Sequence, residues 1–439
     1  MKKLSIIIIA IAFSCNLWSQ TSREEIRQNV NLAASNYLAY QTPTKRLTPQ
    51  PKGKKPFYIS HYGRHGSRYL INRDDYCSVL DILSRAETEN KLTDIGRQTL
   101  QKVRMMCDES NNRYGELTEL GALQHRQIAR RMYKRFPQVF QNNVTVDAKS
   151  TVVIRCILSM ENELQELIRL NPKLKVKHDA SEHDMYYMNF GDKELTESRH
   201  NDDTRAYIDK WSKENINPTR VMSRLFNDEE YIRKNVSSRE LYSKLFRLAC
   251  ILQNSELQHS INLFSLFDEQ DIYSLWQQHN IGWFCEFGSC ELNGGTQPFT
   301  QRNLLRKIIQ EADSCIALKH PGATLRFGHE TMVMPLTCLF NINGYGKMMH
   351  PSQLEDNQWY NFRIFPMACN IQLIFYRKNP NDSDVWVKVL LNEEEATLPI
   401  TPVQGSYYRW SDIRKHYLEM LNAYENRKLK GKGDNMIAQ

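Results

Sequence analysis

A short apolar run that ends in a cluster of basic residues constrains this chain more than any other feature. Phe57-Tyr58-Ile59-Ser60 has the composition of a buried strand, and the polar sequence His61-Tyr62-Gly63-Arg64-His65-Gly66-Ser67-Arg68 follows it directly. In an open α/β sheet, functional side chains commonly lie on such a loop at the carboxyl end of a strand. The pattern therefore predicts an α/β core with a functional loop after Ser60.

Further strands and helices are expected on both sides of a long helical region. Residues 118–136 have helical spacing, with Thr118 as the cap and Pro137 as the stop. The other expected elements are strands at 144–146 and 323–327, helices at 150–167 and 329–340, and a hairpin formed by 369–376 and 385–391. Between about residues 167 and 315 the pattern is helical and polar, without strand alternation.

These patterns predict an α/β protein with an open, mostly parallel sheet flanked by helices and with an inserted all-helical cap domain. The expected segments are a signal peptide (1–19), an N-terminal helix and arm (20–50), an α/β core (51–166 and 316–425), a helical cap domain (167–315) and a basic flexible tail (426–439). Within the second segment, residues 23–40 are expected to be one helix.

The N-terminal sequence is typical of a secretory signal. Met1-Lys2-Lys3 precedes an apolar run and then small and polar residues, an order that predicts export to the periplasm or beyond. A lipid anchor at Cys15 is a less favoured alternative, because the residues before it match a lipoprotein box poorly. No other segment is long and apolar enough to cross a membrane, so the mature chain is expected to have no transmembrane segment.

Charge and cysteine content exclude some functions and leave others open. The formal charge is +8, and loss of Lys2 and Lys3 with the signal leaves 8 − 2 = +6, which permits an anionic substrate but is too small for a nucleic-acid binder. Nine of the ten cysteines remain after Cys15 is removed, so at least one is free. Cys285 and Cys290 are near enough in sequence to pair, and the sequence leaves this open.

The chemistry of the basic cluster suits a phosphoryl group. Arg64 and Arg68 offer planar forks of donors for phosphate oxygens, and their charges favour the neutral, nucleophilic form of His65. Phosphate monoesters are inert, so a catalyst must stabilise the charge on the equatorial oxygens and hold the reacting groups in line. A covalent phosphohistidine then divides one difficult displacement into two easier ones. For any one of these residues alone, a solvated loop charge or a structural turn residue is the better interpretation, but the tight cluster at the end of a strand favours the functional one.

The leaving alkoxide also needs a proton, and an acid beside the cage would supply it. Glu330 is the candidate, because it follows His329 directly at the end of the strand expected at 323–327. With an ordinary pKa of about 4.3 for glutamate, an acidic optimum is expected unless burial or bound phosphate raises that value. No metal or cofactor is expected, since neither a convincing ligand set nor a Walker loop is present.

Several segments resemble the histidine acid phosphatases, branch two of the histidine phosphatase superfamily. The residues His61 to Arg68 are similar to the Arg-His-Gly-x-Arg loop of that family. Other similar segments, in order, are Leu117-Thr118-Glu119-Leu120-Gly121, Ser150 to Arg155 with Ser159-Met160, and Phe327-Gly328-His329-Glu330. Within the family, Ser181 to Asn189 and Leu390 to Glu393 resemble the multiple inositol polyphosphate phosphatases.

The resemblance implies a role for six residues. His65 would be the nucleophile, Glu330 the proton donor, and Arg64, Arg68, Arg155 and His329 the substrate-binding groups that hold the scissile phosphate. The subgroup typically has His-Ala-Glu, whereas Glu330 follows His329 directly, where the His-Asp phytases have an aspartate. This departure affects the placement of the donor and the positional preference on the inositol ring.

The leading hypothesis is a hydrolase for phytate or other inositol polyphosphates. The alternatives are a broad acid phosphatase for sugar phosphates, a weakly active phosphate-binding relative, and a mutase-like transferase of branch one, which the signal and the helical insertion disfavour. His61 is interpreted as a support residue or a purely structural one, and His183 and Asp184 as structural caps or pocket groups. The partner is a small phosphorylated molecule, and the oligomeric state stays open.

Overall fold

The computed structural model describes residues 21–199 and 201–437. The strands are β1 (Lys55–Arg64), β2 (Thr145–Ser150), β3 (Lys175–Asp179), β4 (Gly322–Gly328), β5 (Asn370–Arg377), β6 (Trp386–Leu391), β7 (Glu394–Glu395) and β8 (Tyr407–Arg409). The α-helices are α1 (Ser22–Gln28), α2 (Asp74–Thr88), α3 (Asp94–Ser110), α4 (Glu119–Arg135), α5 (Ile154–Leu170), α6 (Met185–Met188), α7 (Lys193–Arg199), α8 (Asp202–Asn215), α9 (Thr219–Leu225), α10 (Glu229–Asn235), α11 (Ser238–Ile251), α12 (Glu269–Phe287), α13 (Arg302–Ile316), α14 (Glu330–Leu339), α15 (Asn361–Ile364) and α16 (Trp410–Ile437).

The expected α/β class is confirmed, with one open and partly parallel sheet. The strand order is β3-β2-β4-β1-β5-β6-β7, with β8 paired to β6. The strands β3, β2, β4 and β1 are parallel, whereas β5 and the strands after it pair antiparallel. In the register of the central pair Arg64 lies opposite Gly328, so β1 and β4 end side by side. Their carboxyl ends therefore open onto one edge of the sheet.

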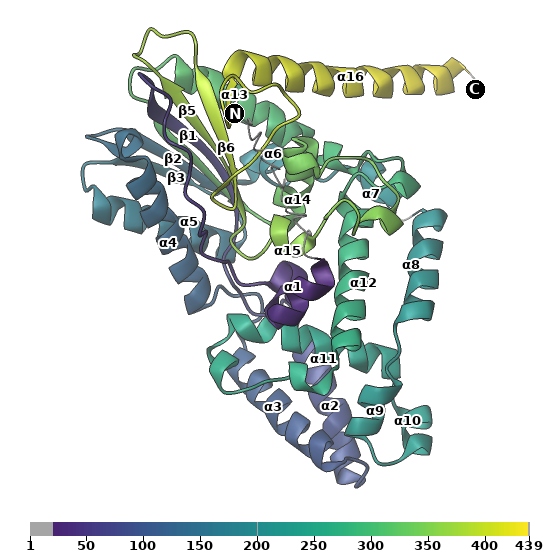
Figure 1. Ribbon diagram of the computed structural model, residues 1–439. Helices are drawn as coiled ribbons and strands as arrows, with labels where there is room; N and C mark the ends of the chain where they lie inside the picture. Colours follow the sequence, from purple (N-terminus) through teal and green to yellow (C-terminus); the bar gives the residue numbers. More distant parts are fainter. Residues whose placement is uncertain (1–20, 200, 438–439) are drawn as a thin grey trace, which may run out of the picture.

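Helices cover both faces of this sheet (Figure 1). Alternation along β1 sends Ile59 into a cluster with α4 and α5, and Tyr58 and Tyr62 into a cluster with α13, α14 and α16 on the opposite face. Both clusters consist of buried aliphatic and aromatic side chains, so the sheet is a central layer. The α4 and α14 helices and the β5–β6 hairpin confirm the elements expected from the sequence.

A helical lobe lies below the carboxyl edge of the sheet in Figure 1. Its apolar cluster includes α2 and α3 as well as α9, α11 and α12, together with Ile26, Ala33 and Ala34 of the N-terminal segment. Tyr360, Phe362 and Met367 join the same cluster, so the lobe is assembled from four separate stretches of the chain, and α2 and α3 lie outside the range expected for a cap. The helix α13, which falls inside that range, packs on the sheet instead.

Three expectations for local structure are corrected. The strand β3 interrupts the region expected to be all helical; it is an exposed edge strand without apolar alternation, so no pattern marks it. The single helix expected at 23–40 is broken at Asn29, whose side chain caps a 3-10 segment, η1 (Val30–Tyr37). The strand β1 continues to Arg64, so the loop after it begins at His65 rather than at His61.

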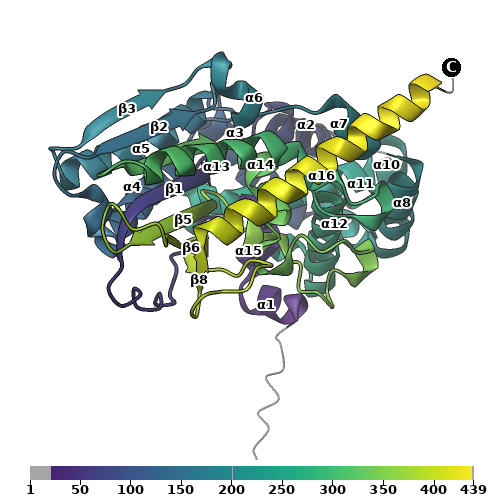
Figure 2. The same cartoon turned by 90° about the horizontal axis from the view of Figure 1, so that it is seen from above.

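The ends of the chain complete the description. The expected signal peptide and Cys15 lie outside the described residues. The expected flexible tail is helical as far as Ile437, because α16 continues through it, and extending an existing helix costs less than starting one. Figure 2 shows α16 crossing the molecule and projecting beyond it. Among residues 21–199 and 201–437, no helix has the length and apolar character needed to span a membrane.

Candidate active site

Three neighbouring parallel strands deliver the predicted site residues to one place. His65 follows β1, His329 and Glu330 follow β4, and Arg155 lies in the first turn of α5 after β2. The order β2-β4-β1 makes these three strand ends adjacent. The carboxyl edge of a parallel sheet is the usual position of a binding site in this class of fold.

The loop after β1 is held against the start of α4. The Ser67 amide donates to Gln124 Oε1 at 2.9 Å, and the Thr118 amide donates to the Ser67 carbonyl at 2.9 Å. Gly66 and Gly121 face each other, and a Cβ on Gly66 would collide with the Gly121 backbone. Glycine is required here because two backbone segments are in direct contact.

His65 presents an unprotonated nitrogen to the site. Its Nδ1 lies 2.8 Å from the Gly66 carbonyl oxygen, which only accepts hydrogen bonds, so Nδ1 carries the hydrogen and Nε2 is free. Nε2 is buried and has no hydrogen-bond partner. Burial, together with the charges of Arg64, Arg68 and Arg155, lowers the pKa of His65 well below its usual value. The imidazole is therefore neutral, as its flanking arginines predict.

Three guanidiniums surround this imidazole. Arg64 is fully buried and Arg68 nearly so, while Arg155 is partly exposed. Arg64 donates to the carbonyls of Asn36 at 2.6 Å and Phe365 at 3.1 Å, and Arg68 donates to the Tyr69 carbonyl at 2.9 Å. The Nε atoms of Arg64, Arg68 and Arg155 are buried without partners. Donors left unsatisfied in this way are costly unless a ligand accepts them.

Glu330 is the acid of the cluster. Its Oε1 forms an ion pair with Arg64 at 2.8 Å, and its Oε2 lies 3.7 Å from Nε2 of His65. Burial raises the pKa of Glu330, but the charges of Arg64 and Arg68 outweigh this effect and lower it to about 2. In the free protein Glu330 is therefore an ionised carboxylate.

His329 completes the ring around the reacting position. Its ring lies edge-on to that of His65, with centroids 5.6 Å apart. Its Nε2 is 3.4 Å from the Thr151 hydroxyl, and Cys156, in the first turn of α5, donates to the Gly328 carbonyl beside it. Burial, with the opposing charge of Glu330 and the charge of Arg155, leaves the pKa of His329 lowered to about 4. His329 is thus a second neutral imidazole in the site.

The cluster suits an anion better than a metal ion. His65, His329 and Glu330 have potential ligand atoms within 4.8 Å of one another. The three guanidiniums beside them repel a cation, however, and the first turns of α4, α5 and α14 lie next to the same position. Helix N-termini and arginine side chains both favour negatively charged ligands.

A buried acid and two histidines support the site from below. Glu163 lies between His61 Nδ1 at 3.3 Å and His125 Nδ1 at 3.1 Å, and none of the three side chains reaches the surface. Two turns earlier on the same helix α5 is Arg155. Between them, Ser159 accepts from the Gly66 amide and donates to the Arg155 carbonyl. His61 is thus part of an internal clamp that joins β1, α4 and α5, and its side chain faces Glu163.

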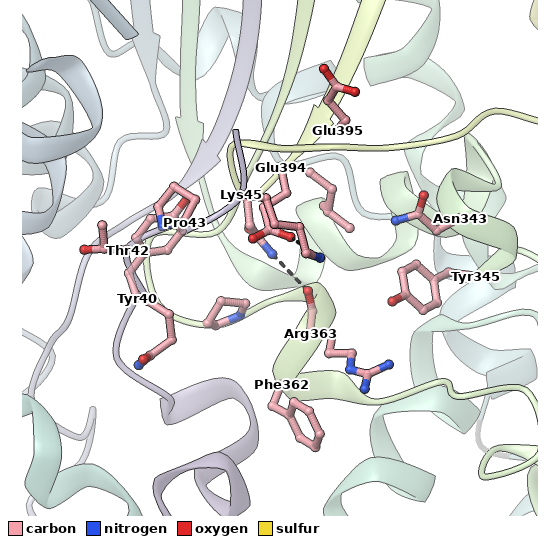
Figure 3. A pocket seen from close by; sticks show the side chains of 14 residues that line it. Tyr40, Thr42, Pro43, Lys45, Asn343, Tyr345, Phe362, Arg363, Glu394 and Glu395 are labelled. Carbon is pink, nitrogen blue, oxygen red and sulfur yellow. Dashed lines mark hydrogen bonds and ion pairs between the residues drawn. The ribbon is translucent and has the colours of Figure 1, made fainter. Parts of the chain in front are cut away.

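Two cavities lie in this part of the molecule, and they differ in how close they come to the site residues. A cavity of about 290 Å³ is lined by Asn36 and Tyr37, which contact the cage, and by residues of α11 and α12 that include Arg247, Gln278 and Trp283. A larger one of about 510 Å³ lies between the N-terminal arm and the segment after β6, and Figure 3 shows Lys45, Arg363 and Glu394 around it. None of the six predicted site residues lines either cavity, and the smaller one adjoins the cage through Asn36 and Tyr37.

All six residues predicted from the sequence lie at this one position. His61 lies behind the loop, and Asp184 forms an ion pair with Lys149 at 2.8 Å. Sequence reasoning missed Asn36, whose side chain donates to Glu330 Oε1, because it fell within an expected helix. It also missed the pairing of Glu163 with His125; these two residues lie on different helices, and no spacing links them. Cys285 and Cys290 are unbonded, with sulfurs 3.8 Å apart.

Comparisons with known proteins agree with this geometry. Residues 64–392 match the model of the histidine phosphatase superfamily (branch 2). No curated protein sequence matches the chain. The multiple inositol polyphosphate phosphatase of Bifidobacterium longum, in complex with inositol hexasulfate, is similar over 87% of this chain and 96% of its own, with a TM-score of 0.75 and 19% identity. The phytase from D. castellii is similar over 89% and 85%, with a TM-score of 0.65 and 13% identity. These likenesses establish the fold.

Proposed function

Because this chain belongs to branch 2 of the histidine phosphatase superfamily, we propose that it hydrolyses phosphomonoesters of inositol polyphosphates, phytate among them, through a phosphohistidine on His65. The observation that carries the proposal is the free Nε2 of His65, buried among three guanidiniums and 3.7 Å from a carboxylate oxygen of Glu330. A neutral nitrogen nucleophile, a cage for an anion and an acid or base within reach are the groups that this hydrolysis requires.

In the first step, Nε2 of His65 attacks phosphorus and the bond to the ester oxygen breaks. The unsatisfied donors of Arg64, Arg68 and Arg155 stabilise the charge on the equatorial oxygens. Glu330 gives a proton from Oε2 to the leaving alkoxide. In the second step, water attacks the phosphohistidine, Glu330 accepts the proton from that water, and phosphate leaves with His65 restored.

The proton on Glu330 arrives with the substrate. In the empty site this carboxyl is ionised. A bound phosphoryl group offsets the positive charges of Arg64 and Arg68, which raises the pKa of Glu330 in the complex. A phosphate monoester has a second pKa of about 6, so its monoanion carries the required proton into the site at acidic pH.

The proposed substrate class rests on two neighbouring structures and on the cavity beside the cage. The neighbour from Bifidobacterium longum was solved with inositol hexasulfate, a sulfated counterpart of phytate, and the D. castellii neighbour is a phytase. The cavity of about 290 Å³ next to the cage offers room beside the phosphate position, and Arg247, which lines it, is paired with Asp75 at 2.6 Å. These observations favour a polyanionic inositol ester.

One observation favours a second candidate, a phosphatase for small monoesters. Ile154, the neighbour of Arg155, is 72% exposed, and Ile71 is 48% exposed. Both Ile71 and the Arg155 guanidinium border Gly115, so apolar side chains stand on this side of the cage. Apolar side chains cannot form ion pairs with the further phosphate groups of a polyanionic substrate. A small monoester with a single phosphate group would therefore bind here equally well.

A substrate panel tests both candidates. Purified protein is given phytate, glucose 6-phosphate and glycerol 2-phosphate, with His65→Ala as the inactive control. The first proposal predicts a kcat/KM for phytate at least about 10-fold above the others, a difference of about 1.4 kcal/mol in transition-state binding. Comparable values would favour the second candidate. Tight phosphate binding with no turnover of any ester would contradict both.

A further inference from the structure

The N-terminal 3-10 segment η1 lies against the catalytic cage. We call residues 30–37 the strap; Ala33, Ala34, Ser35 and Asn36 within it are buried. Figure 1 shows the purple N-terminal segment below the sheet and beside α12. The strap contacts α11, α12 and α15, so it is held between the helical lobe and the catalytic edge of the sheet.

Asn36 contacts two groups of the cage at once. Its backbone carbonyl accepts a hydrogen bond from Arg64 at 2.6 Å, and its side-chain Nδ2 donates to Glu330 Oε1 at 3.3 Å. The next residue, Tyr37, places its ring 5.7 Å below the Arg68 guanidinium. The strap therefore reaches both arginines of the catalytic loop and the acid.

These contacts distinguish the two oxygens of Glu330. Oε1 receives two donors, the Arg64 guanidinium at 2.8 Å and the Asn36 amide at 3.3 Å. Oε2 lies 3.7 Å from Nε2 of His65. An oxygen that accepts two hydrogen bonds is the poorer site for a proton, because a proton there would face both donors.

We propose that Asn36 is a positioning residue which, with Arg64, keeps Oε1 of Glu330 occupied and so directs the transferable proton to Oε2, beside the reacting nitrogen. This inference rests on the proposed function and deepens it by assigning a role to the strap. Asn36 contacts no reacting atom; it acts through Glu330.

The position of Asn36 is fixed by buried contacts on either side. Ser35 has φ 57° and ψ −124°, a conformation that costs free energy for a residue other than glycine. Asn361 Nδ2 donates to the Ser35 hydroxyl at 2.7 Å, and Trp276 Nε1 donates to Asn361 Oδ1 at 3.0 Å. On the other side, Asn254 Nδ2 donates to the Tyr37 carbonyl at 2.7 Å. Buried hydrogen bonds therefore hold the residues on both sides of Asn36, Ser35 and Tyr37, in place.

The test uses two esters that differ in their need for an acid. An alkoxide leaving group, as in glycerol 2-phosphate, needs a proton, whereas the nitrophenolate of p-nitrophenyl phosphate leaves without one. We expect Asn36→Ala to lower kcat for glycerol 2-phosphate by about 10-fold, the loss of one charge-assisted hydrogen bond, and to change kcat for p-nitrophenyl phosphate by less than about 2-fold. Asn31→Ala is the matched control, because Asn31 is exposed on the same strap.

Asn36→Asp is a second, nearly isosteric variant that does not depend on the first. A carboxylate beside Oε1 repels the ionised form of Glu330 and raises its pKa, so the basic limb of the kcat profile should move to higher pH.

If the wild-type protein turns over both esters, three results would overturn the inference. The first two are an equal loss of kcat on both esters in Asn36→Ala and no loss on either ester in that variant. The third is a basic limb of the kcat profile that does not move in Asn36→Asp. Absence of wild-type turnover on both esters would instead overturn the proposed function and the inference with it.

Discussion

At Glu330, burial and charge act in opposite directions on one carboxyl group. The arginine charges prevail and hold its pKa at about 2 in the free protein. The free protein is therefore arranged to bind an anion, and the acid becomes available only when that anion is present.

Replacing this acid should have an effect that depends on the leaving group. Glu330→Gln keeps the size of the side chain but removes the transferable proton, and general acid catalysis contributes about 100-fold or more. We expect kcat to fall by about that factor for glycerol 2-phosphate and much less for p-nitrophenyl phosphate. Parallel kinetics on the two esters measure this. The same loss on both would show that Glu330 does not protonate the leaving group.

The pH dependence follows from the same charges. His65 has a pKa far below its usual value, so loss of the nucleophile through protonation does not limit activity under mildly acidic conditions. Because the substrate monoanion brings the proton, kcat/KM should fall as pH rises through about 6, the second pKa of the ester. A pH–rate profile from about 3 to 8 checks this. Activity that increases steadily up to pH 8 would exclude the proposed proton route.

How far the sequence predicts the site differs from residue to residue. Arg64, His65 and Arg68 share one short loop, so their chemistry is visible without a fold. Arg155 lies nearly a hundred residues away and was assigned only through the resemblance. Asn36 carries no signal at all, because its role depends on a strap whose position is set by contacts with α11, α12 and α15.

At the scale of elements, the clamp of His61, Glu163 and His125 joins β1, α4 and α5 beneath the catalytic loop. Glu163 is ionised although fully buried: burial raises its pKa, but His61 and His125 lower it to about 2. Since the folded pKa lies below the ordinary 4.5, this carboxyl stabilises the fold above pH 4.5, and the contribution is lost as pH falls through about 2.

Glu163→Gln should therefore destabilise the protein by about 1–3 kcal/mol, because its amide nitrogen cannot accept a hydrogen bond and a buried histidine N–H loses its acceptor. Urea denaturation at neutral pH measures the loss. Glu161→Gln on the same helix is the control, since Glu161 pairs with the exposed His178 at the surface, where such pairs contribute about 1 kcal/mol or less. Equal stability of the two variants would show that the clamp is not a source of stability.

Elements with strong apolar patterns were predictable, and elements fixed by tertiary contacts were not. The strands β1, β4, β5 and β6 are buried almost throughout, and their apolar runs marked them in the sequence. The edge strand β3 is mostly exposed and reads as polar. The break at Asn29 depends on a local cap that competes with a continuous helical pattern.

At the scale of the molecule, the α/β sheet and the helical lobe meet at the carboxyl edge of the parallel strands. The sheet with its flanking helices supplies the six residues proposed to react with or bind the substrate, and the helical lobe holds the strap against them. Export from the cytoplasm remains an expectation from residues 1–19, and mass spectrometry of the secreted chain would test it through the predicted cleavage after Ser19.

The charge of the assembled site predicts independence from metal ions. Three guanidiniums border the only group of potential ligands found within the described residues, and they repel cations. Activity should therefore be retained within about 2-fold after incubation with a chelator and dialysis, because no step requires a Lewis acid. Loss of activity that a divalent ion restores would contradict this assignment.

The central claim is that Nε2 of His65 accepts the phosphoryl group, and trapping the intermediate tests it most directly. Protein mixed with ³²P-labelled ester is quenched in alkali within the first turnover, digested and sequenced. The account predicts acid-labile label on the peptide that contains His65, and neither label nor turnover in His65→Ala. Label on another residue, or turnover by His65→Ala at the wild-type rate, would contradict it.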